Sequence, residues 1–289
     1  MAGILYVCAT PIGNLGDMTP RVVECLKNAD LIAAEDTRES LRLLNRFDIH
    51  TAFCSYHEHN KYEKADTLIA GLLEGKNIAL ITDAGTPAIS DPGEVLVRKC
   101  HEAGITVTSL PGASAVVTAL SVSGLPSGRF VFEGFLPQEN RDRKKIIKEL
   151  SAERRTIVLY EAPHHLKKTL RELAEHLGTR ELAICRELTK KHEEVLRMTL
   201  PEALDYYGTT EPRGEFVLVI APPDGEDVLK DEKRDWEGLT LEAHVSRYLE
   251  EGMDKKAAMK KVALERGISR REVYQALLSA SEEKEDSHE

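Results

Sequence analysis

Hydrophobic residues follow two alternating patterns over residues 1–223. Short, mostly apolar runs predict strands at 4–9, 31–35, 78–82, 107–110, 130–135, 156–161, 182–187 and 216–221. Longer segments with apolar residues every three or four positions predict helices at 20–28, 40–47, 61–74, 93–103, 113–121, 140–150, 165–176 and 201–207. Because strands that alternate with helices build βαβ units, the pattern predicts an α/β fold with largely parallel sheets.

The segment 121–129 (SVSGLPSGR) interrupts this alternation with Gly, Ser and Pro. We therefore predict two α/β lobes, an N-terminal lobe over residues 1–123 and a second lobe over residues 124–223. The charged segment 224–237 directly follows two prolines, and it is predicted to be a linker.

The pattern changes after this segment, where helical repeats occur without any strand. The repeats cover 240–251, 254–266 and 269–280. Ser269 and Glu272 have the spacing of a capping box at the start of the third repeat. We predict a compact three-helix unit of the helix-turn-helix kind over residues 238–280, followed by an acidic tail at 281–289. The basic side chains of this unit either contact nucleic acid or form a solvated face.

The composition is that of a folded protein, with 42% hydrophobic and 30% charged residues among 289. No apolar run approaches the roughly 18 residues of a membrane helix, and the N-terminus has no signal-peptide pattern. We expect a cytoplasmic protein with no membrane partner. The five cysteines lie at least 17 residues apart, and the pairs His57/His59 and His164/His165 lack a third ligand. No metal site is therefore predicted.

The net charge of −10 is distributed unevenly along the chain. The segments 224–236 and 281–289 together carry −7 of it. The two predicted lobes are therefore close to neutral, which leaves room for a basic face on them.

Three loops rich in Gly and Pro directly follow predicted strands: TPIGNLGD (10–17), TDAGTPAISDPG (82–93) and SLPGASA (109–115). The second is the most specific, because two Gly, two Pro and two Asp within twelve residues exceed what a plain connector needs. Open α/β sheets bind ligands at the carboxyl ends of their strands. The sequence contains neither G-x-G-x-x-G nor Gly-Lys-Ser/Thr, which excludes the Rossmann dinucleotide fingerprint and the Walker A loop.

Two further strand ends carry polar side chains. AAEDTRES (33–40) places two carboxylates and an arginine after a first-lobe strand, and LYEAPHH (159–165) places a tyrosine, a carboxylate and two histidines after a second-lobe strand. Loops from both lobes therefore predict one binding cleft between them.

These motifs carry a resemblance to a known family. TPIGNLGD, AEDTR, TDAGTPAISDPG, PGASA, LYEAPHH and PRGEF, in this order, resemble the bacterial 16S ribosomal RNA 2′-O-methyltransferase I family of the tetrapyrrole-methylase superfamily, over residues 3–222. The resemblance implies S-adenosylmethionine as methyl donor, bound between the lobes. It also implies a cytidine ribose 2′-hydroxyl in the decoding region of 16S ribosomal RNA as acceptor, the small ribosomal subunit as partner, and a homodimer.

The resemblance also assigns cofactor contacts by position. They are Pro11, Ala84, Gly85, Thr86, Ile89, Ser114, Ala115, Tyr160, Glu161, Leu188 and Gly214. One departure concerns Thr86, because tetrapyrrole methylases typically have Gly-Asp-Pro where this chain has Gly-Thr-Pro. Either the aspartate is replaced here, or Asp83 takes its role.

Methyl transfer to a ribose hydroxyl needs alignment of the reacting atoms, and a nearby proton acceptor helps. The candidate catalytic carboxylates are Glu35, Asp36 and Asp83, and His57 is the imidazole candidate. Each of them has a structural alternative, such as helix capping or pairing with Arg38. Alignment alone, with water as proton acceptor, is a further alternative.

RNA binding requires positive charge, and Lys and Arg are densest at 138–155. The predicted RNA contacts are Arg38, Arg141, Arg143, Lys144 and Lys145. The alternative for the 138–155 segment is a solvated amphipathic helix.

Two other functions fit parts of the pattern. A small-molecule methyltransferase acting on a tetrapyrrole needs the cofactor loops but neither the basic segment nor the helical extension. A non-enzymatic RNA-binding protein needs the basic residues but not the cofactor loops. Binding of S-adenosylmethionine separates the second possibility from both enzymes.

Overall fold

The computed structural model describes residues 1–223, 239–250 and 252–285. Residues Met1–Pro223 form one compact unit, and the described residues after 238 belong to another. The predicted linker, residues 224–237, lies outside the described residues.

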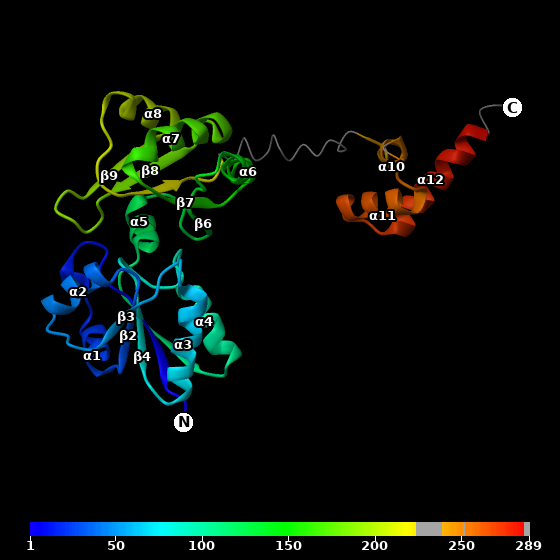
Figure 1. Ribbon diagram of the computed structural model, residues 1–289. Helices are drawn as coiled ribbons and strands as arrows, with labels where there is room; N and C mark the ends of the chain where they lie inside the picture. Colours follow the sequence, from blue (N-terminus) through cyan, green and yellow to red (C-terminus); the bar gives the residue numbers. More distant parts are fainter. Residues whose placement is uncertain (224–238, 251, 286–289) are drawn as a thin grey trace. The chain divides into compact units, whose positions relative to one another are not determined.

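The first sheet is parallel throughout and has helices on both faces (Figure 1). Its strands are β1 (Ile4–Cys8), β2 (Leu31–Ala34), β3 (Phe53–Ser55), β4 (Ile78–Ile81) and β5 (Thr106–Leu110), in the order β3-β2-β4-β1-β5. Its helices are α1 (Pro20–Asn28), α2 (Thr37–Arg46), α3 (Lys61–Leu73) and α4 (Gly93–Glu102), and a short 3-10 turn, η1, spans Leu15–Asp17.

Alternation along β4 shows how this sheet is covered. Ile78 and Leu80 pack with leucines of α3 and α4, whereas Ala79 and Ile81 pack with apolar side chains of α1 and α2. Because both faces of the sheet are buried, its central strands are apolar at every position. The sequence motifs that follow β1, β2, β4 and β5 consequently lie at one edge of the sheet.

The second sheet has the order β6-β7-β10-β8-β9. Its strands are β6 (Phe130–Phe135), β7 (Thr156–Glu161), β8 (Glu181–Arg186), β9 (Glu194–Thr199) and β10 (Phe216–Ile220). The helices α6 (Asn140–Ser151), α7 (Pro163–Leu177) and α8 (Leu200–Thr209) cover one face. The other face packs against α5 (Ala115–Ser123), which precedes the first strand of this sheet.

The α/β class predicted from the sequence is confirmed, but the prediction of largely parallel sheets is wrong for the second sheet. Only β6 and β7 run parallel there, whereas β10 is antiparallel to both β7 and β8, and β8 is antiparallel to β9. The cause is β9, which the hydrophobic pattern does not predict. Its mixed residues EVLRMT form a hairpin with β8, so the chain returns without a helical crossover.

The second unit contains α10 (Leu241–Glu250), α11 (Lys255–Arg266) and α12 (Arg270–Glu285). The apolar side chains that pack together come from all three helices and include Val245, Met259 and Val273. The predicted capping box is confirmed, because Ser269 N donates to Glu272 and Glu272 N donates to the Ser269 hydroxyl. Helix α12 continues into the segment predicted as a tail, of which residues 286–289 lie outside the described part. In the described ranges, no helix has both the length and the apolarity required to span a membrane.

Candidate functional site

A cavity of about 490 Å³ lies where loops after the first sheet meet the second sheet. Most of the predicted cofactor residues line it, namely Ala84, Gly85, Thr86, Ile89, Ser114, Ala115, Tyr160, Glu161 and Leu188. Pro11 lines a neighbouring cavity instead, and Gly214 is part of neither lining, although the next residue, Glu215, is part of both. The structure thus brings together segments from opposite ends of the two-lobed unit, from Ile12 to Val217.

Backbone hydrogen bonds join two loops of the wall from the first lobe. Thr10 and Gly85 exchange two backbone hydrogen bonds, of 2.8 Å and 3.2 Å, which join the loop after β1 to the loop after β4. Gly85 has a φ of +88°, and a Cβ there would lie 3.2 Å from Ile12 Cγ2. A side chain at position 85 would therefore both strain the backbone and crowd the loop after β1.

Asp91 fixes the second half of the loop after β4. Its carboxylate accepts backbone hydrogen bonds from Ala88 (3.0 Å), Ile89 (3.2 Å) and Gly93 (2.7 Å). Ala88 and Ser90 have φ values of +66° and +67°, a region that side-chain-bearing residues seldom adopt. Asp91 thus stabilises a strained turn at the cavity wall.

Glu35 and Asp83 both line the cavity, whereas Asp36 does not. The Thr82 hydroxyl donates to Glu35, and the Asp36 backbone N–H donates to Asp83 Oδ1 at 2.9 Å. Partial burial, together with the nearby carboxylates of Glu35, Asp36 and Glu39, raises the pKa of Asp83 above its ordinary value. Asp83 is therefore the candidate carboxylate whose proton affinity is increased.

The other two proton-acceptor candidates have different surroundings. The Asp36 carboxylate accepts a hydrogen bond from Arg38 N at 2.7 Å and caps α2. Asp36 therefore has the helix-capping role that was the alternative to catalysis. His57 lines neither cavity, and its backbone N–H donates to Asn60 Oδ1. Within the described residues, the structure does not bring His57 to the cleft.

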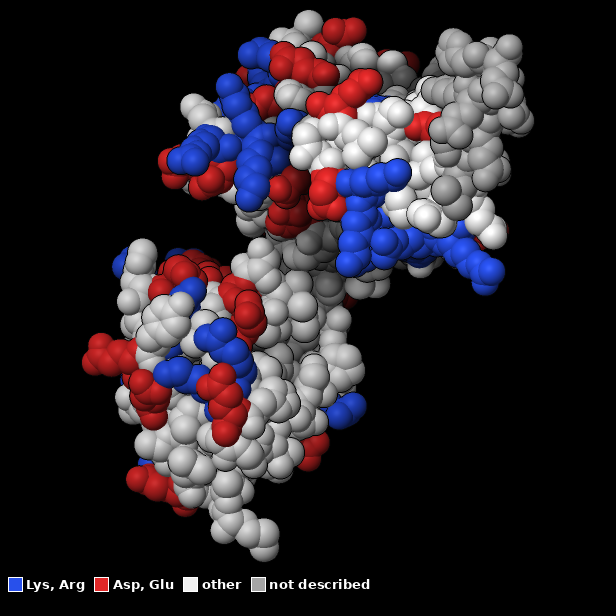
Figure 2. Space-filling model, turned by 90° about the vertical axis from the view of Figure 1, so that its right-hand side faces the viewer, with Lys and Arg blue, Asp and Glu red and all other residues white. Residues whose placement is uncertain are grey.

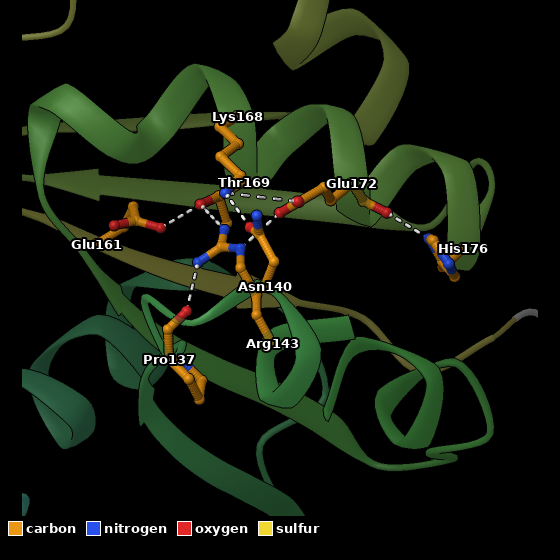
Figure 3. Close-up of polar contacts among 8 residues, drawn as sticks. All are labelled: Pro137, Asn140, Arg143, Glu161, Lys168, Thr169, Glu172 and His176. Carbon is orange, nitrogen blue, oxygen red and sulfur yellow. Dashed lines mark hydrogen bonds and ion pairs between the residues drawn. The ribbon is translucent and has the colours of Figure 1, made fainter. Parts of the chain in front are cut away.

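The wall from the second lobe is held by a chain of side chains (Figure 3). Arg143 of α6 donates to Glu172 (2.6 Å) and to the Thr169 hydroxyl (2.6 Å), both on α7. The Thr169 hydroxyl in turn donates to the Glu161 carboxylate, which lines the cavity and is only 5% exposed. Because the hydroxyl accepts from a guanidinium and donates to a carboxylate, it orients both groups.

The prediction that Arg143 contacts RNA is wrong. Arg143 is 4% exposed and makes the hydrogen bonds just described, because it shares the inward face of α6 with Ile147 and Leu150. The spacing of positions 143, 147 and 150 is the signal that could have revealed this burial. Arg38, Arg141, Lys144 and Lys145 are exposed, and their contacts with RNA stay predictions.

A second cavity of about 470 Å³ shares part of its lining with the first. The shared residues are Ile12, Thr82, Asp83, Ala84, Lys190 and Glu215. Lys190 donates to Glu187 (2.9 Å) and Glu215 (2.8 Å), and its stem leaves no room for a Cβ at Gly13. Lys190 thus packs its stem against the loop after β1 while its charge is neutralised by second-lobe carboxylates.

Known proteins resemble this chain in sequence over nearly its whole length. The family model described as Tetrapyrrole (Corrin/Porphyrin) Methylases matches residues 4–204. A protein of Bacillus subtilis named Ribosomal RNA small subunit methyltransferase I is 47% identical over 274 residues, 95% of this chain and 94% of its own length. A Synechocystis protein of the same name is 49% identical over 277 residues, 96% of this chain and 98% of its own length.

Solved structures with lower sequence identity share the fold. A diphthine synthase has a TM-score of 0.60 at 15% identity and covers 75% of this chain and 89% of its own. A uroporphyrin-III C-methyltransferase from Thermus thermophilus, complexed with S-adenyl homocysteine, has a TM-score of 0.53 at 16% identity, covering 76% of this chain and 97% of its own.

Proposed function

The chain belongs to the tetrapyrrole methylase family, and we propose that it transfers a methyl group from S-adenosylmethionine to the 2′-hydroxyl of a cytidine ribose in the decoding region of 16S ribosomal RNA. Two relatives at 47% and 49% identity are named as ribosomal RNA small subunit methyltransferases, which supports both the chemistry and the RNA substrate. The small ribosomal subunit is the proposed partner, and a homodimer is the proposed assembly.

The first cavity fits the cofactor in volume and in charge. Its volume of about 490 Å³ lies within the range of small-molecule sites. Its lining includes five carboxylates, those of Glu35, Asp83, Asp91, Glu161 and Glu215. The one cation in the described lining, Lys190, is engaged by Glu187 and Glu215. The excess of negative charge suits a ligand whose sulfonium and ammonium groups outweigh its one carboxylate.

The residues of both walls would hold the cofactor. Gly85 and Thr86 offer backbone and hydroxyl groups from the first lobe, and Tyr160 and Glu161 offer a phenol and a carboxylate from the second. When bound, S-adenosylmethionine supplies a methyl group on a positively charged sulfur. The protein therefore has to bring an acceptor oxygen into line with that methyl group and receive one proton.

The observation that carries the proposal is the position of Asp83, which lines both cavities. A group at this junction can face cofactor on one side and acceptor on the other. Its raised pKa increases its basicity at the point where a hydroxyl loses its proton. Glu35 lines only the first cavity and Asp36 lines neither, so Asp83 is the one of the three candidates at the junction. We assign the role of proton acceptor to Asp83.

The test uses small ribosomal subunits from a strain that lacks this protein. They are incubated with the purified protein and methyl-labelled S-adenosylmethionine, and the label is mapped by nuclease digestion and mass spectrometry. We expect label on a single cytidine ribose of the decoding region. Light scattering of the same preparation, with the mass of two chains expected, tests the homodimer.

Two outcomes contradict the proposal and separate the alternatives. Cofactor binding by calorimetry without any label on RNA points to another acceptor, and a tetrapyrrole is then tested in the same assay. Absence of cofactor binding, with RNA binding retained, points to a non-enzymatic RNA-binding protein.

A further inference from the structure

The second cavity contains a buried polar group that lacks a partner. Ser40 lines this cavity and is 4% exposed, and its hydroxyl makes no hydrogen bond within the described residues. Buried hydroxyls are nearly always hydrogen-bonded, because leaving one unsatisfied costs about 1–3 kcal/mol. An orphan hydroxyl in a cavity wall therefore indicates a ligand with a hydrogen-bonding atom at that place.

The same helix supplies positive charge to this cavity. Arg42 and Arg46 line it together with Ser40, and neither lines the first cavity. With Arg38 they stand at intervals of four residues along α2, so they follow one side of the helix at steps of about 6 Å. All three are exposed. A regular row of guanidinium groups suits a chain of phosphates, which arginine binds through paired hydrogen bonds.

The ion pairs within the protein do not prevent Arg42 and Arg46 from binding phosphate. Arg42 pairs with Glu39 at 2.6 Å, but both side chains are more than half exposed, and such surface pairs are weak enough to be exchanged. Arg46 makes no ion pair with any residue that the structure describes. The other carboxylates of the lining, Asp83 and Glu215, lie where the second cavity joins the first, and Lys190 neutralises Glu215. The second cavity is therefore positive at its α2 side and negative at the junction.

We infer that the second cavity binds a phosphodiester of the acceptor RNA, with Arg42, Arg46 and the Ser40 hydroxyl as its donors, next to the ribose presented to Asp83. The inference rests on the proposed function, because it names where that acceptor is held. With the phosphate at the α2 side, the adjoining ribose lies near Asp83. This orientation places the negative charge of the RNA against the positive side of the cavity. The phosphate accepts the Ser40 hydrogen bond that the protein leaves unmade.

A purely structural role for Arg46 is also consistent with its position, since a cation in the last turn of a helix offsets the helix dipole. The two roles differ in what they affect. The dipole role changes the melting temperature, whereas a phosphate contact changes RNA affinity and its dependence on salt.

The experiment measures binding of unmethylated small ribosomal subunits to the full chain at several salt concentrations. We expect Arg46→Gln to weaken binding about tenfold and to lower the slope of log affinity against log salt by about 0.7 to 1. The double variant Arg42→Gln/Arg46→Gln should lose about a hundredfold. Ser40→Ala should weaken binding several-fold without lowering the melting temperature, because its hydroxyl has no partner among the described residues.

The matched control is Arg98→Gln. Arg98 is an exposed arginine of α4 that pairs with Glu102 at 3.9 Å. It lies on the α3 and α4 side of the first sheet, where acidic and basic side chains are interspersed (Figure 2). This variant should bind RNA and cofactor as the wild type does.

The outcomes separate the inference from the proposed function. Unchanged RNA affinity and salt slope in the double variant overturn the inference while the wild type still methylates RNA. A wild type that binds cofactor but neither binds nor methylates the subunits overturns the proposed function itself. Loss of RNA binding in the variants, with cofactor affinity intact by calorimetry, supports the phosphate site.

Discussion

The two walls of the first cavity are built by different means. On the first-lobe side, backbone hydrogen bonds between Thr10 and Gly85 and the Asp91 carboxylate hold the loop after β4. On the second-lobe side, the side chains of Arg143 and Thr169 hold Glu161. The first wall is held by separate hydrogen bonds within its loops, and the second by a continuous chain of side-chain hydrogen bonds from α6 through α7 to Glu161.

This difference determines how each wall responds to substitution. A wall held by several separate hydrogen bonds tolerates the loss of a single one, because the remaining bonds keep the loop in place. The chain of hydrogen bonds in the second wall is more sensitive. When any of its side chains is removed, the neighbouring side chain loses a hydrogen-bond partner in a buried position. Substitutions in each wall test this contrast, and the largest effect is expected at the junction of the two cavities.

We expect Asp83→Asn to reduce the single-turnover rate of methyl transfer by about 10²- to 10⁴-fold, the range for a positioned general base. The affinity for S-adenosylmethionine should change little, because the amide keeps the shape of the carboxylate and can accept the hydrogen bond from Asp36 N. Rapid-quench measurement of label transfer and calorimetry give the two quantities. A rate within threefold of the wild type would remove Asp83 as proton acceptor.

The pH dependence provides the control for this prediction. The pKa of Asp83 is raised above the ordinary 3.8, and only its ionised form accepts a proton. The wild-type rate should therefore rise tenfold per pH unit below that raised pKa and level off above it. The Asp83→Asn rate should lack this limb.

Arg143→Met should lower the free energy of unfolding by about 3 kcal/mol, since it leaves Glu172 without its buried partner. Urea denaturation measures the change. Arg141→Met, at an exposed position of the same helix, is the matched control and should stay within about 0.5 kcal/mol. Similar effects of the two substitutions would mean that the chain of hydrogen bonds does not stabilise the second wall.

Thr169→Val should cost about 1–3 kcal/mol and weaken cofactor binding, because the isosteric side chain cannot join Arg143 to Glu161. Denaturation and calorimetry report the two effects. Thr67→Val removes a hydroxyl that reaches only the Glu63 carbonyl, on the exposed side of α3, and it should be nearly neutral. Unaltered cofactor affinity in Thr169→Val would show that Glu161 does not need this orientation.

The smallest effect is expected from Thr86→Val in the first wall. The Thr86 hydroxyl donates to the Ala113 carbonyl at 3.0 Å, and its loss should cost about 0.5–1.5 kcal/mol. The Thr10 and Gly85 hydrogen bonds remain in this variant, so the loop should keep its shape. A stability loss larger than that of Thr169→Val, measured under the same denaturation conditions, would reverse the comparison.

The contrast between the walls also explains what the sequence could predict. The first wall consists of contiguous motifs that carry the family resemblance, and that resemblance points to Ala84, Gly85, Thr86 and Ile89, all of which line the first cavity. The chain of hydrogen bonds in the second wall joins ordinary residues that lie up to 29 positions apart. The spacing of Arg143 with Ile147 and Leu150 is the only local sign of its burial, and counting charges overlooked it.

The fold shows the same limit. The parallel first sheet follows from alternation of strands and helices, apart from the short β3, which carries too few apolar residues to form a pattern. The strand order of the second sheet depends on where β10 inserts, and that position is determined by packing between residues far apart in the sequence. The second cavity could not be predicted for a similar reason. Ser40, Arg42 and Arg46 line it only together with the loop after β1, which is far from them in the sequence.

The central position of β10 has a consequence for how the protein is made. This strand is the last of the sheet to be synthesised, yet it lies between β7 and β8 and pairs with both. While the ribosome is still translating residues before 216, the first sheet can already fold, but the strands β6–β7 and β8–β9 have no common partner. The second lobe is therefore completed in one late step, and every chain interrupted before β10 carries an unfinished half with two exposed strand edges.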